Sequence, residues 1–112
     1  MYQIVFYRNK RGDYPVKEFI DSLEIKTQAK VYKFLEILQQ EGPNLPRPYA
    51  DILRGKIREL RISHGRLEIR ILYCFCKNKI ILLTNGFLKK ARKTDSTEID
   101  AAISRMNEYI AR

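Results

Sequence analysis

The apolar residues of the N-terminal half form one strand-like pattern and two helix-like patterns. Residues 2–7 alternate as a strand does, with partly apolar residues on both faces. Pro15 then opens a helical pattern, at a position where a missing backbone N–H costs little. Its apolar residues share one helical face: Val16, Phe19, Ile20 and Leu23. The same spacing returns over residues 26–41 and ends at Gly42-Pro43. We therefore predict one strand followed by two helices.

Three strand-like runs and a final helical pattern make up the C-terminal half. Residues 44–49 precede them and contain two prolines. We predict a loop there, because proline is not compatible with a central strand. The runs cover residues 57–63, 67–75 and 79–88, with breaks at His64-Gly65 and Lys77-Asn78. Within the last run, Ile80–Leu83 is continuously apolar, which is typical of a central strand covered on both faces.

The final helical pattern begins near residues 94–96. Asp95, with Glu98 three positions later, is a plausible N-terminal cap. The apolar residues of this helix are Ile99, Ala102, Ile103, Met106 and Ile110. The whole pattern predicts one α+β domain over residues 1–112 with the order βααβββα. Two N-terminal helices should pack on one face of a twisted antiparallel sheet.

Charged residues occupy the other face of the same strands. Strand alternation places Glu59 and Arg61 opposite the apolar residues of their strand, and it does the same for Glu68 and Arg70. A short hairpin through His64-Gly65 should bring Arg61 and Arg70 onto one sheet surface. We expect this surface to face outward, where an anion between the two arginines would relieve their repulsion.

The charge distribution favours a polyanionic partner. The chain has 112 residues and a net charge of +9, and residues 54–93 alone carry twelve Lys and Arg against two Asp and Glu. A field so concentrated attracts nucleic acid. A basic helix lying on a membrane surface is the alternative, but this charge lies on strands and loops. No apolar stretch is long enough to cross a bilayer.

The two cysteines suggest a reducing compartment. Cys74 and Cys76 lie two apart in one strand, so they point the same way and are poorly placed for a mutual disulfide. The N-terminal Met-Tyr-Gln-Ile has no basic lead into an apolar run, so we expect no signal peptide and a cytoplasmic protein. We expect no metal and no cofactor, because one histidine and two strand cysteines are a poor ligand set.

Three motifs in order resemble one known family. They are Leu53-x-Gly55-x-Ile57-x-Glu59-Leu60-Arg61, Arg70-Ile71-Leu72-Tyr73, and Gly86-Phe87-x-Lys89-Lys90-x-x-Lys93-Thr94. With the opening strand, the Pro15 helix start and the last helix, they resemble the RelE/HigB superfamily of toxins, and most closely its phage-derived, HigB-like branch. The resemblance implies a RelE-like fold and a ribosome-dependent mRNA endonuclease. It also implies a cognate antitoxin, of the helix-turn-helix, HigA-like type, and contact with the ribosome and mRNA.

The resemblance suggests catalytic roles for four residues. RNA cleavage without metal needs attack by the ribose 2′-hydroxyl and stabilisation of the negative phosphorane. Arg70 aligns with a family arginine expected to hold the scissile phosphate, and Arg61 is a second phosphate ligand or orients it. Lys90 is expected to stabilise charge on the leaving side. Glu59 is either a general base or an ion-pair partner that orients the arginines.

Five further residues are predicted to bind RNA: Lys56, Arg58, Lys89, Lys93 and Phe87. For Lys56 and Arg58, the alternative is charge at a strand edge that deters edge pairing. Phe87 is placed to stack on a base, with a core position as the alternative. The general acid and base stay open. The only histidine, His64, fits an exposed turn, and Tyr109 fits the rim of the last helix.

Other functions fit the same residues. A ParE-like relative with this fold would inhibit DNA gyrase, although the strand arginines and the lysine cluster favour a nuclease. A non-catalytic RNA-binding module would share the charge but would lose only affinity without Arg70. The plainest alternative is a solvated outer face with no chemistry.

Overall fold

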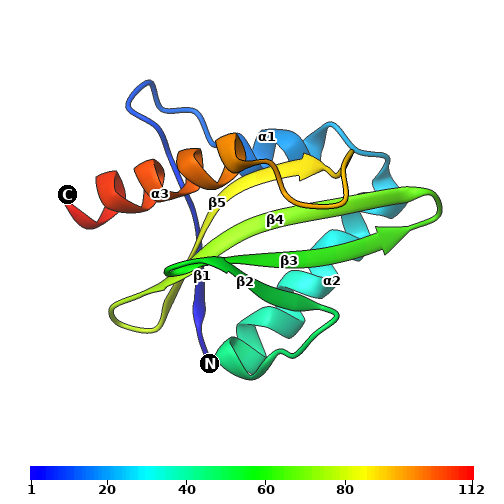
Figure 1. Cartoon of the computed structure of the whole chain (residues 1–112), viewed down its shortest axis with the longest axis horizontal. Helices are drawn as coiled ribbons and strands as arrows, with labels where there is room; N and C mark the ends of the chain where they lie inside the picture. The colour runs from blue at the N-terminus through cyan, green and yellow to red at the C-terminus, as the bar shows by residue number, and fades with distance from the viewer.

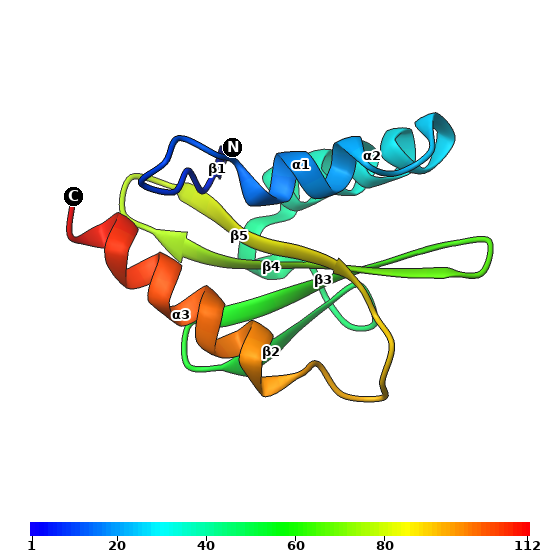
Figure 2. The ribbon, with the colours of Figure 1, turned by 90° about the horizontal axis from the view of Figure 1, so that it is seen from above.

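A five-stranded sheet with helices on both faces organises the protein, whose computed structural model describes residues 1–112 (Figures 1 and 2). The strands lie in the order β1-β5-β4-β3-β2. The elements are β1 (Gln3–Phe6), α1 (Pro15–Asp21), α2 (Ile25–Glu41), the 3-10 helix η1 (Gly42–Asn44), β2 (Ala50–Arg54), β3 (Ile57–His64), β4 (Leu67–Cys76), β5 (Ile80–Leu88) and α3 (Ser96–Ile110).

This architecture confirms the predicted α+β class and adds two features to the predicted order. β2 is an additional edge strand, antiparallel to β3. The sequence pattern missed it because its five residues carry no clear alternation, and Ile52 is exposed at the edge. β1 runs parallel to β5, whereas the other neighbouring strands are antiparallel.

The larger core lies between the sheet and helices α1 and α2. As predicted, the apolar faces of both helices are buried, with Val16, Ile20 and Val31 inaccessible to solvent. The sheet contributes the apolar face of β3 and β4 together with Ile81 and Leu83 of β5. This burial fixes which face of β3 and β4 points away from α1 and α2, since strand side chains alternate.

A second, smaller core lies under α3 on the opposite face of the sheet (Figure 2). Ala102 of α3 packs there with Leu72, Cys74 and Leu82. β5 is thus covered on both faces, as its apolar run predicts. The inclusion of Ile110 in the apolar face of α3 was wrong. Ile110 is 56% exposed, because the last turn of α3 extends beyond the sheet (Figure 1).

Local chemistry accounts for the ends of several elements. Asp95 caps α3 as predicted, with its carboxylate accepting a hydrogen bond from the backbone N–H of Thr97. Asn78 and Lys79 both have left-handed backbone angles in the β4–β5 turn, the geometry of a tight hairpin turn. The Cys74 and Cys76 thiols are free and share a hydrogen bond at 4.0 Å instead of a disulfide. None of the helices combines the length and apolarity that crossing a membrane requires.

Candidate active site

Arg61 and Arg70 lie side by side on the face of the sheet turned toward α3. They are direct partners in the antiparallel register of β3 and β4, which confirms the predicted hairpin geometry. Each residue's strand neighbours point into the larger core, so alternation turns both guanidinium groups to the other face. Two like charges in this position repel, and the pair persists only with compensating anions.

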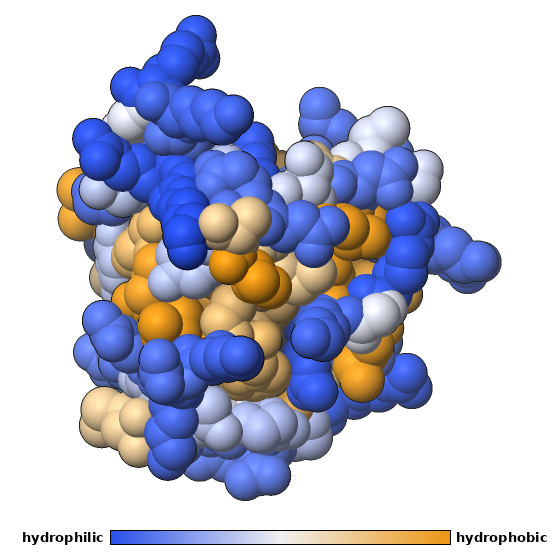
Figure 3. Space-filling view, turned by 90° about the vertical axis from the view of Figure 1, so that its left-hand side faces the viewer, coloured by the Kyte–Doolittle hydropathy of each residue, from blue (hydrophilic) through white to orange (hydrophobic).

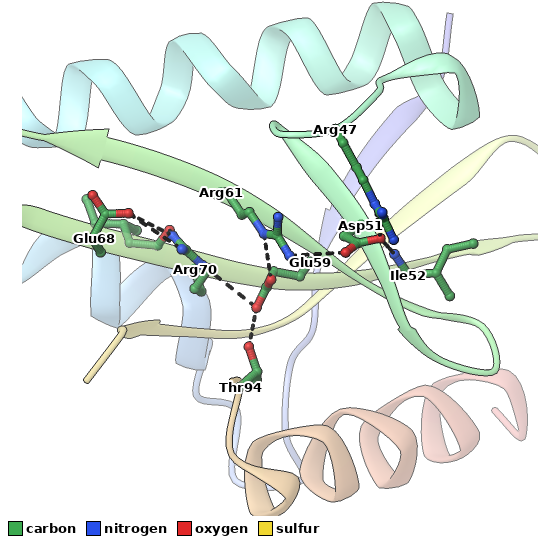
Figure 4. A network of polar contacts seen from close by, with 9 residues as sticks. Arg47, Asp51, Ile52, Glu59, Arg61, Glu68, Arg70 and Thr94 are labelled. Carbon is green, nitrogen blue, oxygen red and sulfur yellow. Dashed lines mark hydrogen bonds and ion pairs between the residues drawn. The ribbon is translucent and has the colours of Figure 1, made fainter. Parts of the chain in front are cut away.

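Glu59 supplies the anion between the two arginines (Figure 4). Arg61 Nε donates to Glu59 Oε2 at 2.9 Å, and Arg70 Nε lies 3.8 Å from Glu59 Oε1. The hydroxyl of Thr94 also donates to Glu59 Oε1. The carboxylate therefore has partners on both oxygens, and the protein itself relieves the repulsion that an external anion was expected to relieve.

The expectation of an outward-facing arginine surface was wrong for half of this cluster. Arg70 is only 4% exposed and Glu59 only 2%. The segment that leads into α3 folds back across this face and brings Thr94 onto Glu59 (Figure 4). Arg61 differs, because 32% of its side chain is accessible. Of the two arginines, Arg61 is the one that a ligand reaches from solvent.

The cluster continues outward at both ends as alternating charges. Asp51 of β2 binds Arg61 Nη2 at 3.1 Å and Arg47 Nε at 3.0 Å. At the other end, Arg70 Nη1 lies 3.5 Å from Glu68 and donates to the carbonyl of Ile69 at 2.9 Å. We call this set the arginine–carboxylate network: Arg47, Asp51, Arg61, Glu59, Arg70, Glu68 and Thr94.

The outer carboxylates of the network are held in their charged form. For Asp51, burial raises the pKa, but hydrogen bonds from Arg47 and from the Ile52 N–H outweigh it and the pKa lies below its ordinary value. A hydrogen bond from Ser63, together with Arg70 and Lys89, lowers the pKa of Glu68. Both groups are therefore anions at neutral pH, as ion pairing with arginine requires.

A cavity of about 480 Å³ adjoins this network. Thr94 belongs to both, since it binds Glu59 and also lines the cavity. Four residues predicted to act on RNA gather here: Phe87, Lys89, Lys90 and Lys93. Phe87 is also the register partner of Arg70, so the aromatic ring and the arginine come from adjacent positions of β5 and β4. The structure thus brings the lysine loop and the strand arginines together.

Lys56 and Arg58 lie away from this group. Arg58 faces the α2 side of the sheet, where its guanidinium carbon is 5.0 Å from the centre of the Phe75 ring. Lys56 precedes β3 and lines a second hollow, of about 520 Å³, with Cys76 and Arg112. Figure 3 shows this side of the molecule, where apolar side chains lie between hydrophilic ones. Lys89 lies at the end of the sheet opposite to Lys56, where its backbone N–H donates to the backbone carbonyl of Glu68.

Neither candidate for the general acid or base joins the arginines. His64 lies on the opposite face of the sheet, where its Nδ1 is 2.8 Å from the Thr27 hydroxyl of α2. It is therefore partly buried and not a free turn residue. Tyr109 packs at the rim of the second core, as expected from its helical position, and lines the hollow that contains Lys56.

Three residues of the network were not identified from the sequence: Arg47, Asp51 and Thr94. Asp51 lies in the unpredicted strand β2, and its pairing with Glu59 exists only in the folded sheet. Thr94 is 35 positions from Glu59 along the chain. No local motif signals either contact. The structure contains no group of three His, Cys, Asp or Glu side chains placed to hold a metal ion.

Comparisons with known proteins agree with this fold. The model of the family described as "Phage derived protein Gp49-like (DUF891)" matches residues 18–107. A Mycobacterium tuberculosis protein described as "Putative toxin HigB2" is 31% identical in an alignment 103 residues long, and the match covers 86% of this chain. That alignment spans 51% of the relative, so this chain matches about half of its length.

The fold also has a solved counterpart. A chain of an archaeal RelE–RelB complex from Pyrococcus horikoshii superimposes with a TM-score of 0.50 and 21% identity, covering 82% of this chain and 98% of the other. The matches confirm the resemblance to the RelE/HigB superfamily that the motifs indicate. Since the family model spans most of the chain, this protein belongs to the Gp49-like family of phage-derived proteins.

Proposed function

We propose that this protein is the toxin of a toxin–antitoxin pair and cuts mRNA on the ribosome. One observation carries the proposal: the paired Arg61 and Arg70 lie next to a cavity that is lined by three lysines. Guanidinium groups bind phosphate through paired hydrogen bonds, and clustered cations stabilise the charge of a phosphorane. The described similarity of this chain to HigB2 supports the toxin assignment.

Arg61 is the proposed contact to the scissile phosphate. Its partial exposure allows a phosphate to replace the carboxylate of Asp51 as its partner. Arg70 is buried against Glu59 and acts as a positioning residue in this proposal. Both oxygens of Glu59 are already engaged, which favours an orienting role for this carboxylate over that of a general base.

Lys90 and its neighbours supply positive charge on the leaving side. They lie on the loop that lines the cavity and also carries Thr94. His64 and Tyr109 lie elsewhere, so we propose that the ribosome completes the geometry for proton transfer. That dependence would restrict cleavage to message that is being translated.

The proposed partner is a small helix-turn-helix antitoxin in the cytoplasm. The structural counterpart with this fold was crystallised as a complex of RelE with RelB. The net charge of +9 favours an acidic partner surface. A co-expressed antitoxin should restore growth to cells that express this chain.

The decisive test is primer extension on a reporter mRNA in a purified translation system. We expect cuts only in ribosome-occupied message, and none in the same RNA without ribosomes. Arg70→Ala should lower the cleavage rate by about a hundredfold or more, as loss of a group that organises phosphate binding does. A loss below about tenfold would remove Arg70 from the site. If no cuts form, a DNA supercoiling assay with gyrase tests the alternative function of this fold.

A further inference from the structure

The cavity beside the arginine–carboxylate network opens at an edge of the sheet. β1 pairs with β5 only over Ile80–Leu83, so the second half of β5 has no strand on its outer side. The cavity lies at this edge, bounded by Phe19 of α1, the loop after β5 and the first turn of α3. Its size is that of a small-molecule site. Backbone polar groups of an unpaired strand edge are also available there to a ligand.

Two aromatic rings, Phe19 and Phe87, belong to the apolar part of the wall. Phe19 rests directly on β5, because position 86 has no side chain. A Cβ atom at Gly86 would lie 2.5 Å from Phe19 Cδ2. Phe87 follows on the opposite face of the strand, and both rings are only half-buried. Their accessible faces suit stacking by a flat heterocycle.

The polar part of the wall carries both signs of charge. Lys89, Lys90 and Lys93 line the cavity from the loop. Glu98 lines it from α3, and its Oε1 accepts a hydrogen bond from Asn85 Nδ2 at 3.0 Å. The second carboxylate oxygen of Glu98 is left to accept from a ligand. A nucleotide matches this combination, because it offers a negative phosphate and, in three of the four RNA bases, an exocyclic amino donor.

We propose that this cavity binds one nucleotide of the message, with its base on the Phe87 ring and its phosphate on the lysines. Glu98 accepts a hydrogen bond from the exocyclic amino group and so favours adenine, cytosine or guanine over uracil. That the bound nucleotide belongs to mRNA rests on the proposed function. Glu98 joins the proposed site as a base-selecting residue, and Phe19 joins it as a wall residue.

An acidic peptide strand is the competing occupant of this edge. The lysines would attract it, and the unpaired edge of β5 would accept its backbone. Glu98 and Asp95, however, place two carboxylates in the same wall, and they would repel acidic side chains. The mixed charge therefore favours a nucleotide.

The test measures binding of fluorescein-labelled RNA tetranucleotides to the free protein. UUAU and UUCU should bind several-fold more tightly than UUUU. Phe87→Leu should weaken UUAU binding by about tenfold or more, the effect of losing one base stack. Phe34→Leu on α2, away from the cavity, is the matched control and should bind as the unmodified protein does.

Glu98→Gln tests base selection without removing the ring. This change should bring the affinities for UUAU and UUUU together, whereas the exposed Glu18→Gln should preserve their difference. Equal affinities in the unmodified protein, or a polyglutamate peptide that displaces UUAU from it, would overturn the inference.

Failure of this inference and failure of the proposed function are separable. Selective binding of UUAU without any cleavage on ribosomes would support the cavity and reject the nuclease. If the Glu98→Gln and Phe87→Leu variants cleave mRNA on ribosomes as the unmodified protein does, the result would support the nuclease and reject nucleotide binding in the cavity.

Discussion

Arg61 and Arg70 lie directly opposite each other on β3 and β4, and the carboxylate of Glu59 contacts both guanidinium groups. This relationship places two like charges on neighbouring strands and neutralises them internally. One arginine is buried and the other remains partly exposed. Of this pair, only the guanidinium group of Arg61 is accessible, and ion pairs already hold it in place. Its side chain therefore loses less conformational entropy when a phosphate binds.

Removing the central carboxylate should destabilise the fold. Glu59→Gln leaves the buried Arg70 with the half-exposed Glu68 as its one remaining carboxylate, and breaking a buried pair costs about 3–5 kcal/mol. Urea unfolding followed by circular dichroism measures this loss. Glu68→Gln is the control, since its carboxylate is nearly half exposed and its loss should cost much less. Equal losses for the two variants would contradict the central position of Glu59.

Removing the exposed arginine should affect cleavage more than stability. Arg61→Ala should lower the rate of ribosome-dependent cutting by about 10²–10³-fold, the range for losing one donor to a developing anion. Arg47→Ala is the matched control, because Arg47 binds the same Asp51 but is 76% exposed at the end of the network. Single-turnover primer extension gives both rates. Comparable rates for the two variants would remove Arg61 from the phosphate site.

The lysine loop should govern the salt dependence of RNA binding. Each lysine that contacts a phosphate contributes about 0.7 to the slope of log affinity against log salt for a single strand. The double variant Lys90→Gln, Lys93→Gln should therefore lower this slope by about 1.4. Fluorescence anisotropy with a labelled RNA at several salt concentrations measures it. Lys26→Gln on α2 is an exposed control, and a similar drop for it would indicate a nonspecific charge effect.

Alkaline pH should weaken the folded state through two neighbouring residues of β4. Burial raises the pKa of Tyr73 from 10.0 to about 12, and burial with the adjacent Cys76 raises the pKa of Cys74 from 9.0 to about 12. Well below pH 9 both groups are neutral in the folded and unfolded protein. As the pH rises toward 12, they ionise first in the unfolded chain, so the free energy of unfolding should fall.

Urea unfolding at several alkaline pH values tests this fall. Cys74→Ala removes one of the two groups and should flatten the decrease. Cys76→Ala removes only the smaller cause of the raised Cys74 pKa, so it should flatten the decrease less. A free energy of unfolding that stays constant between pH 9 and pH 11 would contradict the burial of both groups as the cause.

Local sequence was sufficient for most elements and for one feature of the site. Alternation and helical spacing identified both N-terminal helices, the three long strands and the last helix, because burial of one face imposes a fixed period on apolar residues. The same alternation put Arg61 and Arg70 on one surface. It could not detect β2, since a short edge strand with exposed residues has little periodic signal.

The sequence by itself determined the α+β class, the positive charge of the sheet region and the pairing of Arg61 with Arg70. These follow from spacing along one strand or across one hairpin. The tertiary structure alone decided that Arg70 is buried, that Asp51 and Thr94 complete the network, and that Phe19 and Glu98 meet the lysine loop in one cavity. These contacts join residues far apart in the chain, and they form only when α1 and α3 pack on the sheet and β2 pairs with β3.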